Sequence, residues 1–209
     1  MKQSAIILAL ALTLSLLAGC AANQAENTAT VSGTKIAFSD GKITASSTDG
    51  VEINGTALTI TAPGTYVLSG NCADGSMTVE KCVGGVTLVL NGLTLTSETT
   101  APIVCGKGSA VTIEAAAGTE NTLTDTESNN DETGNADAEN AVIKCKDGSR
   151  VVLCGAGALN VQANGKNGVK SGAATEDGEA SLTIRDLTLN IDAPVNDAVN
   201  AEAALEVES

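Results

Sequence analysis

The stretch Val86–Ser97 reads VTLVLNGLTLTS, and its alternation of apolar with polar residues predicts a β-strand with two different faces. Shorter segments of the same kind recur along the chain, beginning at Val111, Val151, Leu182 and Leu205. Counted from Val86, successive segments begin 25, 40, 31 and 23 residues apart. The two longer gaps contain polar insertions, Asp125–Asn140 and Gly172–Ala180, so the segments indicate a repeat that loops interrupt.

A second set of segments shares this register. Four triplets each begin with a large apolar residue and mostly end with a small one; they start at Ile103, Ile143, Val169 and Val199. The offset from Cys105 to Cys145 is 40 residues, equal to the offset from Val111 to Val151. Because side chains alternate along a strand, Ile143 and Cys145 should point inward and Lys144 outward.

The two sets together predict an all-β protein, a single-stranded right-handed parallel β-helix (a solenoid) over residues 34–209. Stacked coils bury a continuous core through contacts with their neighbours, so they need no large aromatic residues. The competing fold is a β-sandwich, which would require clearer two-residue hairpin turns between its strands.

Composition narrows the function classes. The 209 residues include no His and no Trp, and Phe38 and Tyr66 are the only aromatics. This excludes His-based catalytic triads, His-ligated zinc sites and a sugar-binding face of stacked aromatic rings. The net charge of −14 disfavours nucleic acid as a partner and favours cations.

The N-terminus reads as an export signal. Lys2 precedes the apolar stretch from Ile6 to Leu17, which has signal-peptide length and is too short for a convincing membrane-spanning helix. The following Leu-Ala-Gly-Cys matches a bacterial lipobox, so residues 1–19 are expected to be a lipoprotein signal peptide and Cys20 the lipidated residue. Residues 20–33 would then be a flexible tether, with the protein exported and anchored at the outer face of a bacterial membrane. A plain secretory signal is the alternative.

Several blocks resemble a known family. They are TITAPGTYVLSG (Thr59–Gly70), Val86–Ser97, GTENTLTD (Gly118–Asp125), AVIKCKD and NGVKS. From about Ile36 onward the chain is similar to the calcium-binding carbohydrate-binding parallel β-helix family, whose members are often surface lipoproteins with a pectate-lyase-like fold. Two departures stand out: paired acidic residues are missing after Val169 and Val199, and the chain stops in mid-strand, as a short or truncated member would.

The candidate metal ligands form two groups. Asp125, Asp137 and Asn140 belong to an acidic loop rich in the oxygen ligands that Ca²⁺ prefers, although its spacing is not that of an EF-hand. Asn167 and Asp197 each lie two residues before an inward Val, with Asn140 one residue out of register. The alternatives are a solvated acidic insertion for the loop and structural hydrogen bonding to turns for the Asx residues.

Five cysteines remain beyond Cys20, so at least one has no partner within the chain. Cys72 and Cys82 flank a short segment and are the candidate disulfide. Cys105 and Cys145 should lie near each other inside adjacent coils, where they could be buried thiols. Without His or a Cys-x-x-Cys motif, neither zinc binding nor thiol catalysis is favoured.

The resemblance and the anchor together imply a non-catalytic protein that binds polysaccharide at the cell surface, with Ca²⁺ as a structural or bridging ion. Outward rows of Thr and Asn would supply hydrogen bonds to a neutral glycan. The alternatives are a calcium-dependent polysaccharide lyase on the same fold and a calcium-stabilised adhesin or scaffold. Arg150 and Arg185 are the only arginines that could act as a lyase base.

The lipobox yields the first testable expectation. Cys20→Ala removes the thiol that would accept the lipid, so the variant should move from the detergent phase to the aqueous phase on phase partitioning. If wild type and variant both partition into the aqueous phase, the chain carries no lipid at Cys20.

Overall fold

The computed structural model describes residues 32–176 and 178–208. The expected signal peptide, Cys20 and nearly all of the tether lie outside these residues. The described part is all-β and consists of two sheets, confirming the predicted class. In residues 32–176 and 178–208 no helix is long and apolar enough to cross a membrane.

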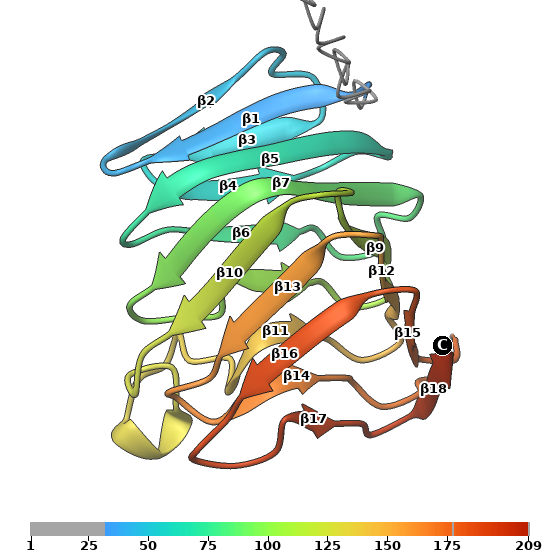
Figure 1. Cartoon of the computed structure of the whole chain (residues 1–209). Coiled ribbons are helices and arrows are strands. Elements are labelled where there is room, and N and C mark those ends of the chain that lie inside the picture. Colours follow the sequence, from blue (N-terminus) through green and yellow to red (C-terminus); the bar gives the residue numbers. More distant parts are fainter. Residues whose placement is uncertain (1–31, 177, 209) are drawn as a thin grey trace, which may run out of the picture. The chain divides into compact units, whose positions relative to one another are not determined.

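The larger sheet has eleven strands and contains the segments that the alternating pattern predicts. Its strands are β1 (Thr34–Ser39), β2 (Lys42–Ala45), β5 (Gly64–Cys72), β7 (Val86–Ser97), β9 (Ala110–Ala115), β10 (Glu120–Asp125), β12 (Arg150–Cys154), β13 (Ala158–Gln162), β15 (Ser181–Arg185), β16 (Thr188–Asp192) and β18 (Ala204–Glu208). Strands β5, β7, β10, β13 and β16 lie side by side across the front of Figure 1.

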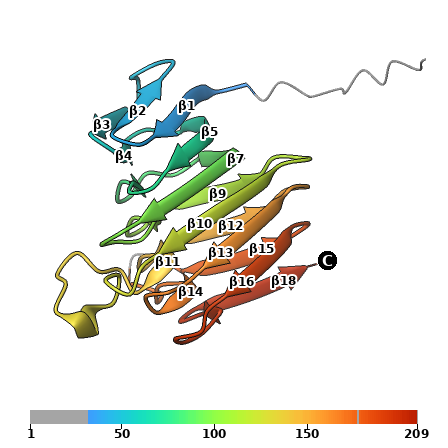
Figure 2. The same ribbon diagram turned by 60° about the vertical axis from the view of Figure 1, so that its left-hand side comes forward.

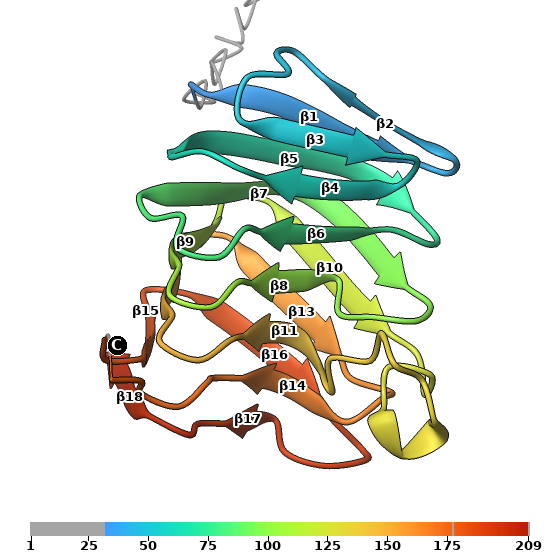
Figure 3. The same ribbon diagram turned by 180° about the vertical axis from the view of Figure 1, so that it is seen from behind.

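The smaller sheet has seven strands and contains the predicted triplets. Its strands are β3 (Val51–Asn54), β4 (Ala57–Ile60), β6 (Ser76–Val79), β8 (Ile103–Cys105), β11 (Ala141–Cys145), β14 (Asn167–Lys170) and β17 (Val199–Asn200). Figure 3 shows them stacked on the far side of the molecule. From β5 onward the chain passes back and forth between the sheets, adding one layer each time (Figure 2).

The predicted registers are confirmed residue by residue. Val86 pairs with Val111, Val111 with Val151, Val151 with Leu182, and Leu182 with Leu205, all in parallel. In the smaller sheet Ile143 lies between Ile103 and Val169, and Val169 pairs with Val199.

Both sheets nevertheless combine parallel with antiparallel strand pairs, which the sequence did not predict. Near the N-terminus β1 and β2, and likewise β3 and β4, pair antiparallel as hairpins. Each hairpin has a short turn with a glycine at positive φ, Gly41 (+80°) and Gly55 (+60°). These hairpins end the parallel stack on its N-terminal side.

The core is a column of aliphatic side chains, and the two aromatic residues lie at its N-terminal end. Phe38 and Tyr66 are both buried, and the Tyr66 hydroxyl donates to the carbonyl of Ala62 at 2.9 Å. The later layers fill the core with Leu, Ile and Val instead, among them Leu88, Leu123 and Leu153. Stacked aliphatic rows therefore replace the aromatic core of an ordinary globular domain.

Strand β7 bends in its middle, and this bend divides the larger sheet into two rows. Its first half pairs with β9 and its second half with β10. Gly92 adopts a φ of +75° at the bend, and the buried Asn121 accepts from the N–H groups of Gly92 and Leu93, both at 2.9 Å. The Asn121 amide also donates to the Ala158 carbonyl, so one side chain bridges three layers.

The inward and outward positions of β11 give a test of the packing. Ile143 is fully buried, so Ile143→Asp should place an unpaired charge between layers and lower the free energy of unfolding by several kcal/mol. Lys144 faces outward and is half-buried, so Lys144→Ala should change it by only about 0.5 kcal/mol. Chemical denaturation measures both, and equal losses would mean that the strand face is wrongly assigned.

Candidate functional site

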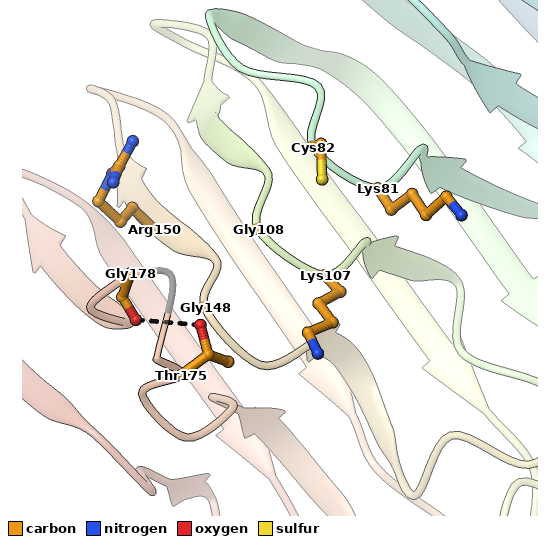
Figure 4. A pocket seen from close by; sticks show the side chains of 8 residues that line it. All are labelled: Lys81, Cys82, Lys107, Gly108, Gly148, Arg150, Thr175 and Gly178. Atoms are coloured by element: carbon orange, nitrogen blue, oxygen red, sulfur yellow. Dashed lines mark hydrogen bonds between the residues drawn. The ribbon is translucent and has the colours of Figure 1, made fainter.

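A pocket of about 340 Å³ opens where three successive layers turn from the smaller sheet to the larger one. We call it the basic pocket, because three of the lining residues that the structure describes are Lys or Arg and none of these described residues is acidic. Its lining consists of Lys81, Cys82, Lys107, Gly108, Gly148, Arg150, Thr175 and Gly178 (Figure 4).

Neighbouring turns are hydrogen-bonded to one another, which fixes how the lining residues stack. The Cys82 N–H donates to the Lys107 carbonyl at 2.8 Å, and the Gly108 N–H donates to the Asp147 carbonyl at 3.0 Å. These bonds continue the parallel register of β6 and β8, in which Val79 pairs with Cys105. Lys81 and Lys107 therefore occupy the same turn position in successive layers.

The position after Lys81, Lys107 and Asp147, which occupy equivalent turn positions, has a left-handed backbone. Gly108 and Gly148 have φ values of +70° and +68°, and Cys82 takes the same conformation with a φ of +62°. A non-glycine residue pays a steric cost there, and such residues concentrate at functional sites. The exposed Cys82 thus lines the basic pocket from a strained turn.

The second polar insertion supplies the remaining wall of the basic pocket. Thr175 and Gly178 form an isolated antiparallel bridge, and the Thr175 N–H donates to the Gly178 carbonyl at 2.9 Å. The Gly148 N–H donates to the Ala173 carbonyl at 2.9 Å, which attaches this insertion to the preceding layer. Residues that the sequence pattern treats as a loop between strands therefore belong to a site.

Positive charge continues from the basic pocket along the outer face of the smaller sheet. Lys107 also lines a second hollow of about 260 Å³, whose lining includes Lys144 and Lys146 together with the acidic Glu139 and Asp147. Lys144 is in register with Lys170, and burial, followed by repulsion from Lys170, lowers the pKa of Lys144. We call these six cations the basic strip: Lys81, Lys107, Lys144, Lys146, Arg150 and Lys170.

Two cations of the basic strip form ion pairs, and four form none within the described residues. Lys146 contacts Glu139 at 2.6 Å, and Lys170 contacts Glu202 at 3.0 Å. In contrast, no carboxylate of residues 32–176 and 178–208 lies within 4.0 Å of the charged groups of Lys81, Lys107 and Arg150. Lys144 likewise has no such contact in these residues; it lines the second hollow, whereas the other three line the basic pocket.

A second surface is polar and almost uncharged. The outward side chains of β7, β10, β13 and β16 form two rows in register, and we call this surface the polar face. The rows are Thr94, Thr122, Asn160, Asn190 and Thr96, Thr124, Gln162, Asp192. Side chains of adjacent strands support each other, since Asn190 donates to Asn160 at 2.9 Å and Thr124 to Gln162 at 3.2 Å.

The candidate metal ligand Asp125 is buried and fully occupied. It ends β10, where its Oδ1 accepts from the N–H groups of Asn164 (2.7 Å) and Gly165 (3.0 Å) and its Oδ2 from the Asn129 amide (2.8 Å). Burial raises the pKa of Asp125, and the hydrogen bonds partly oppose this shift. In the structure this carboxylate fastens the start of the acidic loop to the next layer.

The rest of the acidic loop is held mainly by its own amides and by lysines. It contains a short 3-10 helix, η1 (Asp131–Thr133), which Asn130 caps. Lys166 contacts Glu132 at 2.9 Å, and this contact raises the pKa of Lys166. Asp137 is exposed, and its N–H donates to Asn135.

The stacked Asx residues hydrogen-bond to turns, as the structural alternative predicts. The Asn167 amide donates to the Asn140 carbonyl at 2.7 Å, and its oxygen accepts from Asn196 at 2.9 Å. Asp197 is exposed one layer further on and accepts from Asn200. The structure thus brings Asn140 and Asn167 together. In residues 32–176 and 178–208 no three Asp, Glu or Cys side chains are grouped to hold a metal ion.

Of the two expectations for the cysteines, the disulfide is wrong and the buried pair is confirmed. Cys72 and Cys82 are free thiols rather than a disulfide, because strand β6 lies between them and Cys72 is buried while Cys82 is exposed. Cys105 and Cys145 are paired in register and fully buried, as expected. A hydrogen bond with Cys145, together with burial, raises the pKa of Cys105 well above its ordinary value, which keeps this thiol protonated and unreactive.

Comparison with known proteins gives the family. A family model described as "Carbohydrate-binding domain-containing protein" matches residues 54–209. The chain belongs to this family. A relative of the same name from Acetivibrio thermocellus (strain ATCC 27405) is 34% identical over 171 residues, covering 78% of this chain and 58% of the relative. The chain therefore spans little more than half of that protein's length.

A solved structure supports the fold. It is described as the structure of the polysaccharide lyase-like protein from C. thermocellum, gadolinium derivative, and it superposes with a TM-score of 0.58. The match covers 84% of this chain and 97% of that one at 22% sequence identity. The carbohydrate-binding domain protein thus has a polysaccharide lyase-like fold.

Sequence reasoning missed the basic strip, because its residues are scattered from Lys81 to Lys170. The register of the triplets could have revealed it. Cys105 pairs with Val79 in the preceding layer, and two residues after each of these lie Lys107 and Lys81. The outward middle residues Lys144 and Lys170 were also in the quoted triplets.

The buried carboxylate of Asp125 gives a test by pH. Asp125→Asn keeps one acceptor but turns an amide N–H₂ toward the Asn129 amide, so the variant should lose about 1–3 kcal/mol of stability. The pKa of Asp125 is raised in the folded state, so ionisation of this carboxyl lowers the stability of the wild type. The loss disappears as the pH falls toward the ordinary pKa of an Asp side chain, because the carboxyl is then protonated in the folded protein. The stability gap between wild type and variant should therefore widen at lower pH in urea titrations. A gap that narrows would mean that hydrogen bonding outweighs burial.

Proposed function

We propose that this chain is a lipid-anchored, non-catalytic protein that binds polysaccharide at the bacterial cell surface. The observation that carries the proposal is the polar face, on which hydrogen-bonding side chains repeat in register over four strands. Membership of the carbohydrate-binding domain family supports it. Anchoring through Cys20 follows from the lipobox and belongs to the proposal.

The scaffold in this proposal is a right-handed parallel β-helix. From β5 onward successive layers pair in parallel within both sheets, and the chain reaches the next layer of the larger sheet through a strand of the smaller one. Connections between parallel strands of one sheet are right-handed in nearly all proteins, because of the twist of the strands. The handedness is inferred from this rule.

The polar face suits a neutral glycan. Its Thr, Asn and Gln side chains offer donors and acceptors to sugar hydroxyl groups, and rows one strand apart repeat about every 4.8 Å. Hydrogen bonds such as the one from Asn190 to Asn160 hold the side chains in place before a ligand arrives. Less side-chain freedom is then lost on binding, which favours affinity.

Ca²⁺ is proposed as a structural or bridging ion at the surface. Asp125 is occupied by three donors, whereas Asp137 and Asp197 are exposed and have oxygen atoms free for coordination. A surface ion bound to such carboxylates would complete its shell with water and ligand oxygens. That geometry suits a bridge to an acidic glycan better than a closed internal cage.

A binding role is favoured over catalysis by the surroundings of the two arginines. Arg150 lines the basic pocket, and the lining residues that the structure describes include no carboxylate for a metal ion or an acid–base pair. Arg185 lies 3.5 Å from its neighbour Asp186. A calcium-dependent lyase and a glycan-free adhesin are the alternatives, and release of unsaturated sugar products would support the lyase.

A glycan array read with calcium and with chelator tests the proposal. Replacing both Thr122 and Asn160 by Ala should weaken binding of neutral glycans roughly thirtyfold, since each of the two lost hydrogen bonds contributes about 1 kcal/mol. Thr112→Ala is the matched control, because Thr112 is an outward, half-buried Thr in the neighbouring row.

Equal losses in the polar-face variant and in the Thr112→Ala control would contradict the assignment of the polar face. The absence of binding to any glycan would contradict the proposed function as a whole. Identical binding in calcium and in chelator would remove the bridging ion from the proposal.

A further inference from the structure

We propose that Asn54 is a site of spontaneous deamidation, a covalent modification that is independent of glycan binding. Its side-chain amide cyclises onto the backbone nitrogen of Gly55 and leaves as ammonia. The turn between β3 and β4 thereby acquires an aspartate or an isoaspartate. Water is the only other reactant.

The reaction needs a glycine after the asparagine, because a larger side chain would hinder the attack. The glycine nitrogen gives its proton to water and attacks Cγ of the asparagine, and the new C–N bond closes a five-membered succinimide ring. The bond from Cγ to the side-chain nitrogen breaks, and this nitrogen takes up a proton and leaves as ammonia. Water then opens the ring at either carbonyl, which gives aspartate or isoaspartate. A glycine N–H that donates a hydrogen bond is held away from this attack.

The sequence contains four Asn-Gly pairs, and the structure protects three of them in the same way. In each of the three, the glycine N–H donates to an acceptor from another layer. The donors are Gly92 to Oδ1 of Asn121 (2.9 Å), Gly165 to Oδ1 of Asp125 (3.0 Å) and Gly168 to the carbonyl of Asp197 (3.0 Å). The attacking nitrogen of these pairs is therefore engaged in the folded protein.

The fourth pair, Asn54 and Gly55, lacks this protection. Both residues are exposed, and the Gly55 N–H donates to no acceptor within the residues that the structure describes. Apart from the adjacent residues, no described atom lies within 4 Å of the place that a Cβ on Gly55 would take. Solvent and the side chain of Asn54 can therefore reach the Gly55 nitrogen.

The position of this turn also lowers the cost of the local opening that cyclisation requires. Among the described residues β3 pairs with β4 alone, so the hairpin lies at the edge of the smaller sheet (Figure 3). The Thr56 carbonyl accepts from the Ser76 N–H at 3.1 Å, which fixes the β4 side of the turn to the next layer. The Asn54 side is held by the hairpin only. Segments with few such bonds open at a low free energy, so Asn54 can reach the reactive conformation.

Deamidation should loosen the N-terminal end of the stack. Isoaspartate carries one additional carbon atom in the backbone, so a two-residue turn can no longer keep Asn54 opposite Ala57. Strand β3 also contributes the buried Val51 to the core. The altered protein should therefore melt at a lower temperature than the fresh protein.

Peptide mapping by mass spectrometry, during incubation of the folded protein in mildly alkaline buffer, tests the inference. Asn91 is the matched site, because it is also exposed and precedes a glycine with positive φ, Gly92. Asn54 should react at least about tenfold faster than Asn91, since a typical hydrogen bond changes such an opening equilibrium by about this factor. In guanidinium chloride all four pairs should react at similar rates, because the protection exists only in the folded protein.

Two variants identify the source of the acidic form that ion-exchange chromatography separates. Asn54→Gln should abolish most of this form, because glutamine would have to close a six-membered ring. Asn91→Gln should leave its rate of formation unchanged. The inference is wrong if Asn54 reacts no faster than Asn91 in the folded protein, or if the two variants reduce the acidic form equally.

Discussion

Parallel pairing in register is the constraint on which the rest of this structure depends. Each residue has its equivalent about 4.8 Å away in the next layer, as Val111 and Val151 show. Equivalent positions in adjacent layers therefore tend to carry residues of the same type, which contact one another. Apolar positions become continuous rows, which explains how a core almost without aromatic residues is closed to water.

The same constraint makes polar residues in the interior expensive, and the structure admits them where they join layers. Asn121 is fully buried, yet it accepts from two N–H groups at the bend of β7 and donates to the Ala158 carbonyl. Asp125 is likewise buried, with donors from Asn164 and Gly165. Both side chains accept from backbone N–H groups at corners: Asn121 where the two rows of the larger sheet separate, and Asp125 where the chain leaves β10 for the acidic loop.

The sequence predicted the repeated register because period-two alternation survives in each layer, as in Ile143 and Val169. It did not predict the hairpins at β1–β2 and β3–β4, because antiparallel and parallel strands share the same alternation. The basic pocket was missed for another reason. Its residues lie in turns outside the alternating segments, and the register of the triplets was not extended back to Val79; the bond from Cys82 to Lys107 shows that the two turns are neighbours.

Stacking also explains why charge is divided so unevenly over this chain. Like charges in equivalent positions repel, and most acidic residues avoid this by lying in loops or by pairing, as Glu139 does with Lys146. Lys81 and Lys107 are stacked without such a partner in residues 32–176 and 178–208. In a chain with 25 acidic residues, partners for two lysines would be easy to supply. Both lysines are exposed, so water screens their mutual repulsion and leaving them without an ion pair costs little stability.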